Sequence, residues 1–277
     1  MYRTLREKIK MNHSETLPTT LYLWPQRTLF LGYIGPLAPL NIGAHTLLVG
    51  VDQEIPVTVG DRTIVSDSLL IPAGTSFSAS SNGGRIGCCF LDPMGRDFRF
   101  HKSRMREDEA GLFVADIKKD VQHQILAQLH DEQADAEQAY SELAGILFPA
   151  GDQAVADFRA DERIAEVISR IRSDPSDNVS NNTLADAVGL SGDRLQRLFK
   201  EVTGVPIRRY RLWHRLFVTS SMMALGSSLT DAALAAGFSD SSHLTHAFKS
   251  MLGMSPSTVL RRSQQIRILV GQGEGFT

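Results

Sequence analysis

The chain has 277 residues, of which 42% are hydrophobic, and its formal net charge is −2. This length suits two domains of ordinary size, and the apolar content is enough for a buried core in each. The nearly neutral total excludes a strongly basic protein, but the charge is unevenly distributed. Residues 159–262 contain 14 Lys and Arg against 10 Asp and Glu, whereas residues 102–157 are acidic. A local basic excess is consistent with a segment that binds DNA in a salt-sensitive way.

The two cysteines, Cys88 and Cys89, are adjacent in the sequence. Neighbouring side chains on a strand point to opposite faces, so these thiols cannot ligate one metal ion together. We expect both to be buried, reduced and packed as small apolar groups, with a redox switch as the alternative. The sequence has no secretory signal and no apolar run long enough to span a bilayer, which predicts a cytoplasmic location and no membrane partner.

The N-terminal third of the chain has the texture of short strands. Residues 1–17 are polar and basic, and we expect them to form a mobile tail. Residues 18–101 alternate apolar runs with turns rich in Gly and Pro, which predicts a sandwich or a barrel. The expected strands are residues 28–34, 46–51, 55–59, 63–65, 68–71 and 85–91.

The run LLIPAGTSF at residues 69–77 resembles the second half-motif of the cupin barrel, in which a histidine follows Pro-x-Gly. Phe77 stands in the place of that histidine, and of the first half-motif only His45 remains. The resemblance implies a cupin-like sensor barrel over residues 18–101, with His45 and Phe77 as weak candidates for its ligand pocket. Because a catalytic metal needs about three protein ligands, the sequence predicts neither a metal nor another cofactor.

Residues 102–152 are expected to be a helical packing segment. Ile117, Val121, Ile125 and Leu129 recur every four residues and suggest one apolar stripe. Residues 149–152, PAGD, are the candidate linker to the next domain.

Residues 153–262 are expected to form an all-α domain that opens with a helix at residues 161–171. Residues 229–256 predict a short helix with Thr230 as its N-cap, a turn at Gly237, and a second helix from Ser239. The apolar side chains of that second helix fall at i, i+3, i+4 and i+7 and are Leu244, Ala247, Phe248 and Met251.

The same pattern occurs earlier, in residues 184–206, at an offset of about 48 to 49 residues. Gly189 corresponds to Gly237, and the apolar stripe is Leu195, Leu198, Phe199 and Val202. Residues 207–225 contain no Gly or Pro and predict one long helix between the two units. Such paired helices with polar outer faces are typical of helix-turn-helix DNA readers.

The paired motif, with the wording GFSD…SH…AFK in its second copy, resembles the AraC/XylS family of transcription regulators over residues 160–262. The resemblance implies an α+β two-domain protein that binds two successive major grooves of double-stranded DNA. It also implies a homodimer through residues 102–152, although these helices could instead pack only on their own barrel. A small-molecule effector and RNA polymerase are further candidate partners. Residues 263–277 are expected to be a C-terminal tail with no recognisable role.

The resemblance also assigns roles to individual side chains. The base-reading positions would be Asp193, Arg194, Gln196 and Arg197 in the first unit and Ser241, Ser242, Thr245 and His246 in the second. Arg197 can bond guanine O6 and N7, and Gln196 can bond adenine N6 and N7. Cationic side chains beside these helices would contact phosphates, namely Lys200, Arg208, Arg209, Arg211 and Lys249.

Two other functions compete with that of a regulator. A cupin-type isomerase or oxygenase with a helical appendage would need a metal centre, for which the ligands are missing. A DNA-repair adaptor would need an activated thiol beside a cation, but Cys88 and Cys89 lie in an apolar run. The effector, the target promoter and the choice between activation and repression do not follow from the sequence.

Overall fold

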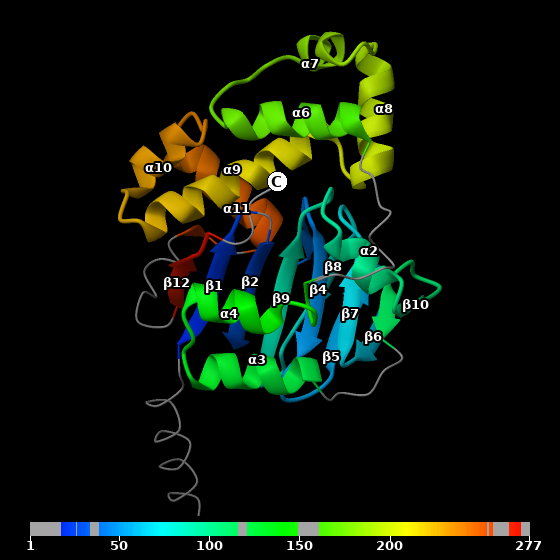
Figure 1. Ribbon diagram of the computed structural model, residues 1–277, viewed down its shortest axis with the longest axis vertical. Helices are drawn as coiled ribbons and strands as arrows, with labels where there is room; N and C mark the ends of the chain where they lie inside the picture. Colours follow the sequence, from blue (N-terminus) through cyan, green and yellow to red (C-terminus); the bar gives the residue numbers. More distant parts are fainter. Residues whose placement is uncertain are drawn as a thin grey trace, which may run out of the picture.

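The computed structural model describes residues 18–25, 27–33, 39–115, 121–148, 161–253, 255–256 and 266–272. A sheet-rich N-terminal part is followed by a helical C-terminal part (Figure 1). The expected N-terminal tail and the candidate linker at residues 149–152 lie outside the described residues. In the ranges that are described, no helix combines the length and the hydropathy needed to cross a membrane.

The N-terminal part contains two sheets. The larger has the strand order β10-β11-β7-β4-β9-β2-β1-β12 and the smaller the order β3-β8-β5-β6. The strands are β1 (Thr19–Trp24), β2 (Arg27–Tyr33), β3 (Leu40–Asn41), β4 (His45–Gly50), β5 (Ile55–Val59), β6 (Arg62–Ser66), β7 (Ser68–Ile71), β8 (Ser76–Ala79), β9 (Arg85–Leu91), β10 (Met105–Glu107), β11 (Phe113–Ala115) and β12 (Ile266–Val270). Each of the six strands expected from the sequence coincides with an observed strand to within two residues.

The large sheet is the middle one of three layers, because its alternate side chains feed two separate cores. One face packs against α3 (Val121–Asp131) and α4 (Ala136–Leu143), which cover the sheet in Figure 1. The other face packs against the small sheet. Cys89 belongs to the first core and Cys88 to the second, as the alternation predicts. Both thiols are buried, and this burial raises the pKa of each well above its usual value.

Residues 102–152, which were expected to be helical, are only partly helical. Residues 105–107 and 113–115 form β10 and β11, which extend the large sheet beyond β7, and a short helix α2 (Asp97–Lys102) precedes them. The four-residue stripe is also partly wrong, because Val121 is 56% exposed. In α3 the buried side chains are Leu126, Leu129 and His130, so the expected member Leu129 is buried, and the expected member Ile125 is partly buried against the same core. The fourth expected member, Ile117, lies outside the described residues.

The C-terminal part consists of α6 (Glu162–Ser173), α7 (Asn181–Ala187), α8 (Gly192–Thr203), α9 (Ile207–Ala224), α10 (Leu229–Ala235) and α11 (Ser241–Leu252). Helices α6, α7 and α8 share one apolar core with the start of α9. Helices α10 and α11 share a second core with the middle of α9. Helix α9 therefore holds the two helix pairs together.

The C-terminal residues have a structural role that the sequence did not suggest. Strand β12 pairs in parallel with β1, from Thr19 opposite Ile266 to Leu23 opposite Val270, and forms the edge of the large sheet. The Gly271 amide then donates to the Leu23 carbonyl at 2.9 Å. The chain thus returns from the helical part to the N-terminal sheet, and the expectation of a tail without a role is wrong for this strand.

Candidate nucleic-acid interface

The two helix pairs are built alike. Ser180 Oγ accepts from the Thr183 amide at the start of α7, and Ser228 Oγ accepts from the Asp231 amide at the start of α10. Ser191 and Asp240 cap the second helices in the same way. The expected cap Thr230 is thus the second residue of α10, and α11 begins two residues later than expected. Gly189 and Gly237, at φ values of 67° and 83°, supply the left-handed turn between the helices of each pair.

Helix α8 presents a polar face opposite its buried stripe. Leu195 and Phe199 are fully buried, because they face α6 and α7. All four base-reading candidates on α8 are exposed, namely Asp193, Arg194, Gln196 and Arg197. Among the residues that the structure describes, the side chains of Arg194, Gln196 and Arg197 form no hydrogen bond or ion pair. Their donors are therefore free to bind an external partner.

Helix α11 presents a smaller and less charged face. Ser242 and His246 are exposed, whereas Ser241 and Thr245 are half-buried. Thr245 Oγ1 donates to the Ser241 carbonyl at 2.8 Å, so its hydroxyl hydrogen is already used. His243 lies at the turn instead, where its ring meets Phe238 edge-on with centroids 5.2 Å apart. This face can offer acceptors and one imidazole, but no permanent cation among these positions.

The cationic candidates fall into two groups. Lys200, Arg208 and Lys249 are exposed. Arg209 Nη1 donates to both the carbonyl and Oδ1 of Asn41 at 2.7 Å, which joins α9 to β3. Arg211 Nη2 donates to the Val179 carbonyl at 2.5 Å, and burial lowers the pKa of its guanidinium. In this conformation one nitrogen of each guanidinium is already used within the protein, and both side chains are only half-exposed.

The weak pocket candidates His45 and Phe77 are both buried. His45 Nδ1 accepts from the Ala73 amide at 3.0 Å, and its ring stacks on Phe98 with centroids 3.7 Å apart. Burial lowers the pKa of His45 to about 3, so the ring is neutral and serves as an acceptor in the core. Within the described chain, no group of three or more His, Cys, Asp and Glu is placed to hold a metal ion.

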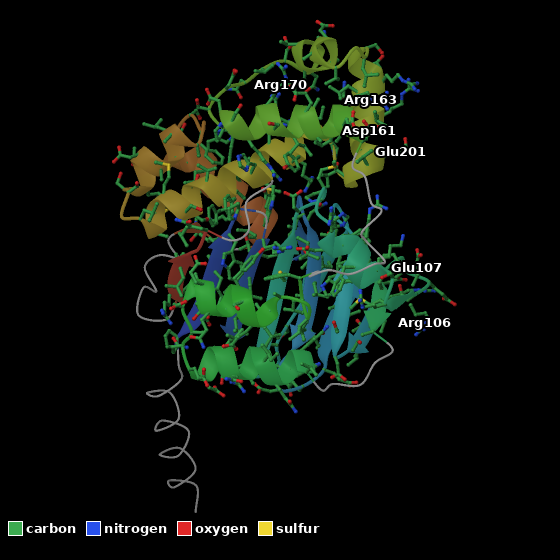
Figure 2. The ribbon with its side chains drawn as sticks, in the orientation of Figure 1. Arg106, Glu107, Asp161, Arg163, Arg170 and Glu201 are labelled. Atoms are coloured by element: carbon green, nitrogen blue, oxygen red, sulfur yellow. The ribbon has the colours of Figure 1, made fainter. Side chains whose placement is uncertain are left out.

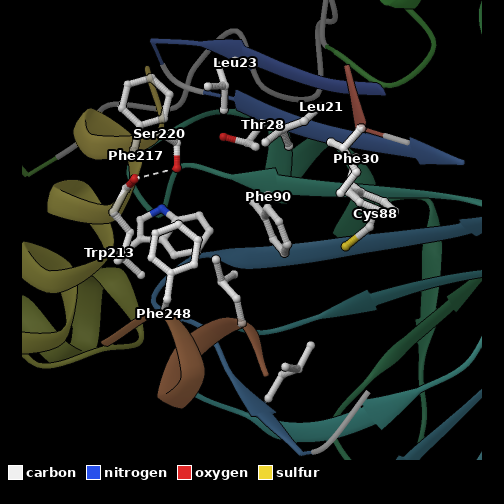
Figure 3. Close-up of a pocket in the computed structure, with 14 residues that line it drawn as sticks. Leu21, Leu23, Thr28, Phe30, Cys88, Phe90, Trp213, Phe217, Ser220 and Phe248 are labelled. Carbon is white, nitrogen blue, oxygen red and sulfur yellow. Dashed lines mark hydrogen bonds between the residues drawn. The ribbon is translucent and has the colours of Figure 1, made fainter. Parts of the chain in front are cut away.

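A cavity of about 100 Å³ lies between the large sheet and the helical part (Figure 3). Neither His45 nor Phe77 contributes to it. Its walls are Leu21, Leu23, Thr28, Phe30, Leu40, Cys88, Phe90, Trp213, Leu216, Phe217, Ser220, Phe248, Leu252 and Ile266. The signal for this site in the sequence is the pair of aromatic residues Trp213 and Phe217 on the long helix α9, a pattern that ordinarily indicates a packed core.

Comparison with known proteins matches residues 184–262 to a family described as a helix-turn-helix domain. The HTH-type transcriptional regulator RipA of Corynebacterium glutamicum is 36% identical over 86 residues, covering 31% of this chain and 26% of RipA. The HTH-type transcriptional activator RhaS of an Enterobacter species is 30% identical over 100 residues, covering 36% of each chain. The chain therefore spans only about a quarter to a third of the length of these relatives.

A solved structure of ToxT from Vibrio cholerae has a TM-score of 0.53 and 15% sequence identity, covering 85% of this chain and 98% of ToxT. At this identity the likeness concerns the fold, in which a sheet-rich domain precedes a helical one. ToxT has also been solved with an unsaturated fatty acid bound, with a TM-score of 0.51 and 14% identity to this chain. Residues 184–262 are thus a helix-turn-helix domain, and the resemblance to AraC-type regulators is confirmed there.

Proposed function

We propose that this protein is a sequence-specific DNA-binding transcription regulator of the AraC type. Its two helix pairs would act as two helix-turn-helix units that enter successive major grooves of one duplex. The observation that carries the proposal is the repeated, capped helix pair whose second helix exposes a polar face. The relatives that match this segment are named as transcriptional regulators.

Base reading would be divided unequally between the two units. Arg194, Gln196 and Arg197 on α8 can form bidentate bonds with guanine or adenine in the major groove. Asp193 would accept from cytosine N4 or orient a neighbouring arginine. On α11, Ser241, Ser242, Thr245 and His246 are short or weak donors, so we expect looser or water-mediated reading.

Phosphate binding would position the two units without specifying sequence. Lys200, Arg208 and Lys249 are exposed and support this role. Arg209 and Arg211 could join them only after leaving Asn41 and Val179.

The N-terminal part would be a cupin-like barrel over residues 18–101 that senses a signal, followed by the helical segment of residues 102–152. Most buried side chains of α3 and α4 face their own sheet, which favours a packing layer. The expected homodimer stays a proposal, and the exposed Val121 on α3 is one apolar group available to it. Since ToxT has been solved with a fatty acid bound, we propose that this chain also binds a small-molecule effector.

Selection of bound duplexes from random DNA by the full chain tests the regulator assignment. We expect an enriched motif with two elements about one helical turn apart. Arg197→Ala should relax one base position and weaken binding by about 10- to 100-fold, equivalent to about 1–3 kcal/mol. Arg170→Ala is the matched control, because Arg170 lies on α6 and pairs with Glu166 away from the reading helices (Figure 2). No enrichment above random sequence, or equal losses in the two variants, would count against the proposal.

A further inference from the structure

The cavity of about 100 Å³ is closed by both parts of the molecule. Strands β1, β2 and β9 of the large sheet supply one wall, together with Leu40 of β3 in the small sheet. Helices α9 and α11 supply the opposite wall, and Ile266 of β12 lies at its edge. A molecule in this cavity would contact the N-terminal sheet and the DNA-binding helices at once.

The walls of this cavity are apolar and rich in aromatic rings. Phe90 and Trp213 meet edge-on with centroids 5.1 Å apart, and Phe30, Phe217 and Phe248 lie around them (Figure 3). Its two polar side chains are Thr28 and Ser220. Ser220 Oγ donates to the Leu216 carbonyl at 2.8 Å, so its hydrogen is not available to a ligand. An engineered apolar cavity of about 150 Å³ binds benzene, so this space is on the scale of a single aromatic ring.

A second, polar cavity of about 30 Å³ adjoins the first. The two share Thr28, Phe90, Trp213 and Phe217 as lining residues. The charged groups of the polar cavity are already paired. Arg27 bonds Asp97 at 2.5 and 2.8 Å, and Arg172 bonds Asp92. An acidic ligand would therefore find no cation free of a carboxylate partner, and its own charge would have to be buried unpaired.

His214 also lines the polar cavity, but its Nε2 is not accessible from it. The Nε2 of His214 is buried and has no hydrogen bond within the described part of the chain. Burial and the nearby Arg172 and Arg215 lower the pKa of His214 to about 4, so the ring is neutral. The polar cavity therefore offers a ligand neither a free cation nor an accessible imidazole nitrogen.

We propose that the apolar cavity binds a small uncharged aromatic molecule without a polar substituent. Its ring occupies the space between the sheet and α9, against Phe90 and Trp213. The ligand's role as an effector rests on the proposed function, whereas its binding in the cavity does not. Because the ligand contacts both β2 and α9, it stabilises the arrangement in which the sheet and the helices are packed together. The shift in that equilibrium is set by the difference between the ligand's affinities for the packed and the unpacked arrangement.

Binding is measured on the purified full chain, without DNA, by calorimetry and by Trp fluorescence. The probes are phenol, toluene and benzoate, which have the same ring with a hydroxyl, a methyl group and a carboxylate. We expect toluene to bind at least about fivefold tighter than phenol, because the phenol hydroxyl would be buried without a partner, and benzoate not to bind.

Two further variants distinguish the loss of the cavity from the loss of the folded structure. Ser220→Leu fills the cavity, whereas Ser221→Leu makes the same change one residue along α9, where the side chain does not line it. Toluene binding should be lost in Ser220→Leu and kept in Ser221→Leu, with circular dichroism confirming that both are folded. Saturable toluene binding that survives Ser220→Leu, binding of phenol or benzoate as tight as that of toluene, or no binding of toluene would overturn the assignment. If toluene binds but no DNA is selected, the regulator proposal fails while the cavity assignment stands.

Discussion

The ion pair between Asp92 and Arg172 joins the sheet-rich part to α6, and Asp92→Asn should weaken this junction. Arg172 Nη2 bonds Asp92 Oδ2, and Arg172 Nε donates to the Tyr210 hydroxyl at 2.8 Å. The two side chains are 8% and 22% exposed, so the pair is largely withdrawn from water. Asparagine retains Oδ1, which accepts from the Met94 amide at 2.7 Å, so the substitution removes the charge and spares the local turn.

Removing one partner of a fully buried pair costs about 3–5 kcal/mol, whereas an exposed pair on a helix contributes about 0.3–0.5 kcal/mol. Because Arg172 keeps Tyr210 and some contact with water, we expect the free energy of unfolding to fall by about 2 kcal/mol, between these limits. Glu166→Gln on the same helix is the control, since Glu166 and Arg170 are 48% and 52% exposed. Urea denaturation followed by circular dichroism measures both variants, and equal shifts would refute the reasoning.

Two further predictions concern stability and the C-terminal strand. The neutral His45 binds no proton in the folded state until about pH 3, whereas the unfolded chain binds one below about pH 6.5. Stability should therefore fall as the pH is lowered from about 6.5 towards 3, and His45→Gln should reduce the difference between urea midpoints at pH 7 and pH 5. Gly271→Val should release β12, because a Cβ there would lie 2.6 Å from Trp24 Nε1; unchanged protease resistance of the C-terminus would contradict this.

The helix pairs were predictable because each is specified by local residues. Gly189 and Gly237 permit the left-handed turns, and serines or an aspartate cap the helices at fixed offsets. The cap at Ser228 was missed in favour of Thr230. Ser228 wins because Asp231, three residues later, offers its amide to Ser228 Oγ and accepts from it at 2.6 Å. Which of two nearby hydroxyls caps a helix depends on such reciprocal bonds.

The helical segment shows why the four-residue spacing misled. At 3.6 residues per turn, each step of four residues rotates by about 40° around the helix, so the three steps from residue 117 to residue 129 would rotate by about 120° in a continuous helix. Val121 consequently points to solvent while Leu129 is buried. Strand β10 was missed because MRE, residues 105–107, is short and charged, and it pairs only at a sheet edge. Strand β12 could not be assigned locally, because its partner β1 is more than 200 residues away in the chain.

The candidate phosphate contacts show a different limit of prediction from the sequence. Arg209 and Arg211 lie on α9 at positions that the family resemblance assigns to DNA, yet one nitrogen of each bonds Asn41 or Val179 instead. The sequence gives their charge but not which carbonyl lies within reach. Lys200 and Arg208 differ from them only in facing solvent, which depends on how α8 and α9 pack against the rest of the molecule.

Helix α9 explains how the proposed effector site could communicate with DNA. Its first turns, with Ile207 and Tyr210, belong to the core of the first helix pair, and Leu216 belongs to the core of the second. Between these points Trp213 lines the cavity. Eighteen residues of helix span about 27 Å, so a small change in how either pair packs on α9 would change the separation of the two proposed reading helices, which would have to meet grooves about 34 Å apart. A ligand beside Trp213 would act on the one element that both helix pairs share, and it would therefore need no separate path to either.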